Sequence, residues 1–61
     1  MKAPTQVPDA VLRGMRKAFP ASTPPVEELI KQLRWDTLNR CYSVEYMGTY
    51  VGIELDGYVH T

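Results

Sequence analysis

The chain has 61 residues, a formal net charge of zero and one cysteine, and 44% of its residues are hydrophobic. A domain of this size buries only about 60% of the surface that its unfolded chain exposes, so its core is thin. A single cysteine excludes an intrachain disulfide and a single histidine leaves no zinc ligand set, so we expect self-association or a larger partner to add stability.

Residues 1–6 show no periodicity and include Pro4, and we expect them to form a flexible lead-in. No apolar run resembles a signal peptide or is long enough to span a bilayer. The sequence therefore predicts a soluble cytoplasmic protein with no membrane partner, or one of the host-cell cytoplasm if it is phage-encoded.

Residues 8–19 are predicted to form the first helix. Pro8 and Asp9 suit its first turn, where the helix dipole favours an acid. Gly14 costs about 1 kcal/mol relative to alanine and makes the helix depend on tertiary packing. Pro20 ends the helix, because the residue before a proline disfavours helical geometry. One apolar face recurs at helical spacing and comprises Val11, Leu12, Met15, Ala18 and Phe19.

A linker over residues 20–24 and a second helix over residues 25–34 are predicted next, because Pro25 and the two acids after it suit a first turn. Trp35 leaves two alternatives. Either the helix stops near Arg34 and the chain turns Trp35 back onto the core, or Trp35 is exposed. We favour the first, because a large aromatic side chain is usually well buried. The narrow apolar stripe of this helix is Val26, Leu29, Ile30 and Leu33.

Residues 41–47 and 50–56 alternate in polarity on the two sides of Gly48 and predict a β-hairpin. With Gly48-Thr49 as a two-residue type II′ loop, Tyr46 faces Val51 on the apolar face, and Val44–Ile53 and Tyr42–Leu55 continue that face. A shift of one residue would bury the carboxylates. The other face collects Cys41, Ser43, Glu45, Met47, Tyr50, Gly52, Glu54 and Asp56, with Met47 beside Tyr50.

Asp56-Gly57 predicts a second turn, of type I′, and a short third strand over residues 58–61. Counting from that turn places Val59 on the polar face and His60 on the apolar face. The predicted fold class is therefore α+β, with two N-terminal helices packed on a C-terminal antiparallel β-hairpin or three-stranded meander.

No catalytic site, metal site, cofactor or small-molecule substrate is predicted. Cys41 and His60 point to opposite faces in the inferred register, whereas a nucleophile needs its base within hydrogen-bond reach. Glu45 and Glu54 are diagonal neighbours in that register, but a flat sheet offers no pocket that excludes water. A solvated face is the simpler interpretation, and we expect a protein that is not an enzyme.

Protein binding is the function that the sequence favours. Residues 1–40 carry a charge balance of +3 and residues 41–61 one of −3. Such a distribution suits association with itself or with a charged partner, but three charges each way also arise easily by chance. The last strand also leaves an edge with unpaired backbone groups. We expect a homodimeric regulator, adaptor or inhibitor of a larger partner, such as a phage- or plasmid-encoded inhibitor of a host complex. Its predicted interface residues are Trp35, Met47, Tyr50, Tyr58 and Val59.

The alternative is a winged-helix-like nucleic-acid-binding regulator, in which a helix enters the major groove. Two features weigh against it. The chain is neutral, whereas DNA-binding domains are usually strongly basic, and the exposed positions of the second helix mix acids with bases. The residues that would contact nucleic acid are Arg13, Arg16, Lys17, Lys31 and Arg34.

Overall fold

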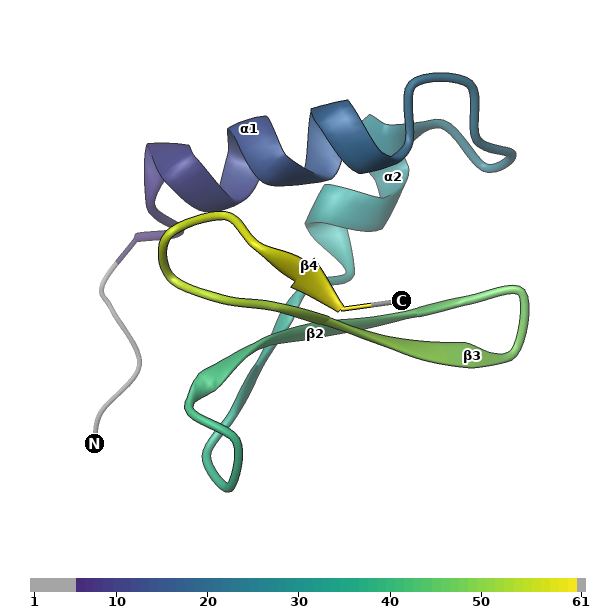
Figure 1. Ribbon diagram of the computed structural model, residues 1–61. Coiled ribbons are helices and arrows are strands. Elements are labelled where there is room, and N and C mark those ends of the chain that lie inside the picture. Colours follow the sequence, from purple (N-terminus) through teal and green to yellow (C-terminus); the bar gives the residue numbers. More distant parts are fainter. Residues whose placement is uncertain (1–5, 61) are drawn as a thin grey trace.

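A computed structural model describes residues 6–60 of the chain. The described part folds into two helices and one four-stranded antiparallel sheet of strand order β1-β2-β3-β4. Both helices lie on the same side of the sheet (Figure 1). This arrangement confirms the predicted α+β class. The elements are α1 (Asp9–Ala18), α2 (Val26–Lys31), β1 (Arg34–Asp36), β2 (Cys41–Tyr46), β3 (Thr49–Ile53) and β4 (Val59–His60).

Helix α1 lies within one residue of the predicted bounds at each end. It begins after Pro8, whose carbonyl oxygen accepts the N–H groups of Val11 and Leu12 at 3.0 and 3.2 Å. Helix α2 is shorter than predicted and spans six residues. The chain leaves it through tight turns in which Gln32 donates to Leu29 and Leu33 donates to Ile30.

Strand β1 was not predicted, and it decides between the two alternatives for Trp35. The strand pairs Trp35 with Tyr42 of β2. The two rings meet edge to face with their centroids 5.2 Å apart, and Trp35 packs half-buried against the core. The prediction that Trp35 turns back onto the core is thus confirmed. The buried core comprises Val11, Met15, Phe19, Leu29, Tyr42, Val44, Val51 and Ile53.

The β2–β3 hairpin has the predicted faces but a different register and turn. Tyr46 faces Thr49 and Val44 faces Val51, a shift of two residues from the predicted pairs. The loop is Met47-Gly48, with φ angles of 52° and 77°, as a type I′ turn requires. The predicted type II′ turn was therefore wrong. The same residues still share each face of the hairpin. Side chains alternate between the two faces along a strand, so a register shift of two residues leaves every side chain on its predicted face.

The β3–β4 connection differs from the prediction by one residue. Gly57 donates its N–H to the Glu54 carbonyl oxygen at 2.9 Å, and Glu54 donates its N–H to the Tyr58 carbonyl oxygen at 2.8 Å. The loop therefore contains three residues, Leu55 to Gly57, rather than the two that the Asp56-Gly57 signal indicated. Gly57 has a φ of 96°, in the left-handed region that closes such a loop.

This single-residue shift exchanges the faces of β4. Val59 pairs with Ile53 and packs against the core, and His60 pairs with Gly52 on the opposite face. Both assignments reverse the prediction, because an odd shift moves every side chain of a strand to the other side. Except for Gln6, the predicted lead-in lies outside the described residues, as does Thr61. No helix within residues 6–60 is long and apolar enough to cross a membrane.

Candidate functional site

The face of the sheet that points away from the two helices is the candidate site, and we call it the outer face. Figure 1 shows that neither helix lies on this side of the sheet. The strand registers place its side chains by alternation. They are Arg34, Asp36, Cys41, Ser43, Glu45, Tyr50, Glu54, Tyr58 and His60, with Gly52 among them.

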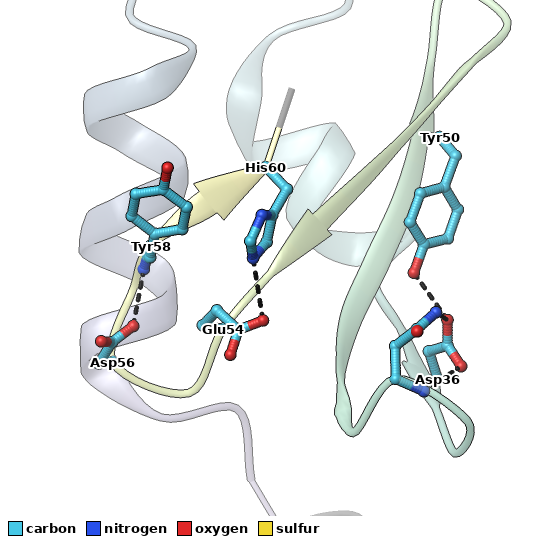
Figure 2. Close-up of polar contacts among 7 residues, drawn as sticks. Asp36, Tyr50, Glu54, Asp56, Tyr58 and His60 are labelled. Atoms are coloured by element: carbon cyan, nitrogen blue, oxygen red, sulfur yellow. Dashed lines mark hydrogen bonds and ion pairs between the residues drawn. The ribbon is translucent and has the colours of Figure 1, made fainter.

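Tyr50 on β3 is tied to Asp36 on β1 across the intervening strand (Figure 2). The Tyr50 hydroxyl donates to Asp36 Oδ2 at 2.7 Å. The Asp36 carboxylate also accepts the side-chain amide of Asn39 and the backbone N–H groups of Leu38 and Asn39. This carboxylate therefore holds the β1–β2 turn and the Tyr50 ring together.

These hydrogen bonds shift the pKa values of both Asp36 and Tyr50. Tyr50 and then Asn39 donate to the Asp36 carboxylate and lower its pKa to about 2, because they stabilise the charged form. The same bond raises the pKa of Tyr50 to about 12, since the hydroxyl donates only while it keeps its proton. At neutral pH the pair is a carboxylate and a neutral phenol.

A second aromatic group lies on β4 and the loop before it. His60 Nε2 lies 3.0 Å from Glu54 Oε2, and the Tyr58 ring packs edge-on against His60 with centroids 4.8 Å apart. Asp56 Oδ1 accepts the backbone N–H of Tyr58 at 3.0 Å. Figure 2 shows this group set apart from the Tyr50–Asp36 pair.

Tyr50 borders two hollows of the outer face. One is a groove of about 580 Å³ between the chain leaving α2, at Lys31 to Arg34, and Ser43 to Glu45 of β2. The other is a cavity of about 320 Å³ on the side of Cys41 and His60. Tyr50 lines both hollows, so it lies where they adjoin.

Cys41 and His60 lie on the same face, which corrects the prediction that they point apart. A Cβ added to Gly52 would lie 3.6 Å from Cys41 Sγ and 3.8 Å from His60 Cδ2, so the two side chains flank this glycine. The imidazole turns its Cδ2 carbon toward Gly52 and its Nε2 toward Glu54. Within residues 6–60, no hydrogen bond joins the thiol to the imidazole, whose Nε2 lies against Glu54 instead.

The diagonal pair of Glu45 and Glu54 is not formed in the observed register, which corrects a second prediction. Glu45 pairs with Tyr50 on the neighbouring strand, and Glu54 bonds His60. In the described part of the chain, no three Asp, Glu, His or Cys side chains gather so that they would hold a metal ion.

The predicted interface residues fall into two groups. Met47, Tyr50 and Tyr58 are exposed, at 82, 51 and 63% of their surface. Trp35 and Val59 pack against the core, so the structure does not bring them together with the others. Met47 lies in the β2–β3 turn and not beside Tyr50, whose partner is Glu45.

Sequence reasoning missed Leu38, which is 94% exposed in the β1–β2 turn, and the roles of Asp36 and Asn39. The sequence Asp36-Thr37-Leu38-Asn39 does indicate a turn. An aspartate in a turn often accepts the backbone N–H groups two or three residues later, as Asp36 does here.

The five basic residues predicted to contact nucleic acid are spread over α1, α2 and β1. Three lie on α1, Lys31 ends α2, and Arg34 lies on the outer face of β1. Arg16 forms an ion pair with Glu27 at 3.0 Å, and Lys31 forms one with Glu28 at 3.6 Å. Two of the five charges are therefore already balanced.

Comparison of the chain with protein families, with curated proteins and with solved structures gives no match.

Proposed function

We propose that the protein is a small, non-enzymatic protein-binding module whose contact surface is the outer face, and that two copies associate through it. The observation that carries this proposal is Tyr50, which is half exposed, bonds Asp36 and lines two adjoining hollows. An aromatic ring that is ordered before contact loses little side-chain entropy on binding. Tyrosine also suits interfaces, because its ring is apolar and its hydroxyl is polar.

The outer face carries charges of both signs, with Arg34 against the carboxylates of Asp36, Glu45 and Glu54. A two-fold interface brings one patch against itself, so the patch must carry both signs. Arg34 supplies a cation at the β1 edge, and Glu45 supplies a carboxylate on β2. Neither side chain has an ion-pair partner within residues 6–60.

Two exposed apolar side chains extend this surface. Leu38 lies in the β1–β2 turn and Met47 in the β2–β3 turn, and these turns lie at opposite ends of the sheet (Figure 1). A contact surface that runs the length of the sheet suits a protein that acts by covering part of a larger partner, as a regulator, adaptor or inhibitor.

The nucleic-acid alternative has weaker support. The exposed side of α2 presents Glu27 and Glu28, which pair with two of the five basic residues, and the helix is only six residues long. Salt dependence separates the two functions, because affinity that depends on phosphate contacts falls steeply with salt, whereas an aromatic interface is much less sensitive.

Light scattering over a concentration series tests the proposal. We expect the wild type to approach the mass of a dimer, and Tyr50→Glu and Arg34→Glu to remain folded monomers by circular dichroism. Arg13→Glu, on the helical side, is the matched control and should still dimerise. A wild type that stays monomeric throughout would overturn self-association, and a Tyr50→Glu dimer of unchanged strength would place the interface elsewhere.

A further inference from the structure

A groove of about 450 Å³ lies between α1 and the β3–β4 hairpin, and Tyr58 is the one residue of the outer-face list that lines it. Gly14, Lys17 and Ala18 line its helix side, and residues 56–59 line its other side. Gly14 and Gly57 form the point of closest approach, because neither has a side chain to hold the two segments apart. The groove therefore runs between the edge strand β4 and the C-terminal half of α1.

At this edge, the backbone of β4 offers one pair of hydrogen-bonding groups that no residue within 6–60 engages. Glu54 bonds the carbonyl oxygen of Tyr58, so these two residues form a hydrogen-bonded pair with β3. Such pairs alternate along an antiparallel ladder, which makes His60 and Gly52 the next one. Val59, between them, directs its N–H and C=O away from β3 toward the free edge.

The helix side of the groove is positively charged. Lys17 lines the groove, and Arg13 lies one turn earlier on α1. Neither forms an ion pair in the described part of the chain. Asp56 on the other side of the groove keeps its negative charge while its Oδ1 accepts the Tyr58 N–H, so Arg13, Lys17 and Asp56 together carry a balance of +1. The site therefore favours an occupant with negative charge.

We propose that this groove binds an extended acidic segment of a partner protein. The segment adds to β4 as a further strand through the N–H and C=O of Val59, and it places a carboxylate against Lys17 and Arg13. A second copy of this chain fits less well. Pairing two β4 strands about Val59 would bring Lys17 of each copy toward the same residue of the other, and like charges at an interface oppose association.

Fluorescence anisotropy with two labelled peptides tests this site. One short peptide alternates glutamate with valine, and the other has the same length but alternates lysine with valine. We expect the glutamate peptide to bind and the lysine peptide not to bind. Lys17→Glu should weaken binding about tenfold or more, whereas Lys31→Glu, outside the groove, should leave the affinity unchanged.

Two further measurements test whether the backbone of β4 binds the peptide. Val59→Pro removes the N–H at the free edge and should abolish peptide binding. Because this variant also risks the stability of the strand, amide hydrogen exchange of Val59 in the wild type gives an independent measure, and saturating glutamate peptide should slow it. Tyr50→Glu should bind the peptide normally, which separates this site from the outer face.

Three results would overturn the proposal. They are equal binding of the two peptides, unchanged affinity of Lys17→Glu, and unchanged exchange of the Val59 amide. A wild-type dimer that Val59→Pro dissociates while the variant stays folded would identify a second copy as the occupant in place of an acidic partner.

Discussion

Gly14 of α1 and Gly57 of the β3–β4 loop meet backbone to backbone. A Cβ at Gly14 would overlap the Gly57 carbonyl oxygen, and a Cβ at Gly57 would overlap the Ala10 carbonyl oxygen. By propensity alone, a glycine inside a helix is a weakness of about 1 kcal/mol. In the folded chain it allows α1 to approach the loop that precedes β4.

Gly14→Ala should therefore destabilise the protein despite its better helix propensity. The added methyl group meets rigid backbone, and overpacking of roughly 1–3 kcal/mol exceeds the propensity gain. We expect a net loss of up to about 2 kcal/mol in the free energy of unfolding, measured in urea. Gly52→Ala is the control, because its Cβ would have no neighbour closer than 3.5 Å. Equal stability of Gly14→Ala and the wild type would contradict the close contact.

The type I′ turn at Met47-Gly48 predicts opposite effects at its two positions. Both residues have a positive φ, which asparagine tolerates and β-branched residues resist. Met47→Asn should raise the free energy of unfolding by about 0.5–1 kcal/mol, and Gly48→Val should lower it by about 1–2 kcal/mol. Thermal and urea unfolding measure both changes. If Met47→Asn destabilises the chain, the turn lies at Gly48-Thr49 instead.

The bond between Asp36 and Tyr50 predicts a loss of stability in acid. Folding holds the pKa of Asp36 at about 2, below its usual 3.8. The stabilisation is therefore complete above about pH 4 and is lost as the pH falls through 2. Tyr50→Phe removes the main donor, so its free energy of unfolding should fall less steeply over this range. Parallel profiles for the two proteins would show that the bond contributes nothing.

The same bond predicts a change at high pH. The pKa of Tyr50 is raised from 10 to about 12, so this stabilisation is complete below pH 10 and is lost as the pH rises through 12. Asp36→Asn should make Tyr50 ionise at lower pH, because an amide carries no charge to oppose the phenolate. Ultraviolet absorbance of tyrosinate measures this, with Tyr50→Phe to identify the contribution of Tyr50.

The face exchange in β4 predicts unequal effects of two neighbouring truncations. Val59→Ala should cost about 1 kcal/mol of stability, because Val59 packs against the core. His60→Ala should cost less than about 0.5 kcal/mol, because the His60–Glu54 pair lies on the exposed side. Urea unfolding compares the two. If His60→Ala lost more stability than Val59→Ala, His60 would be the residue in the core, and the two-residue turn predicted from the sequence would be correct.

The sequence by itself determined the α+β class, both helix starts and the two faces of the β2–β3 hairpin. These features depend on local rules, because a proline with an acid after it marks a first turn, and period-two polarity survives an even shift of register. The sequence also pointed to Tyr50 as a surface aromatic, which the structure bears out.

Only the tertiary structure decided the features that depend on loop length and on contacts between distant residues. Strand β1 is three residues long, too short to show a period, and it forms because Trp35 can lie against Tyr42. The three-residue loop ending at Gly57 placed Val59 inside and His60 outside, since one extra residue reverses a strand. That loop packs on Gly14, forty-three positions earlier in the chain, and no local pattern encodes such a contact.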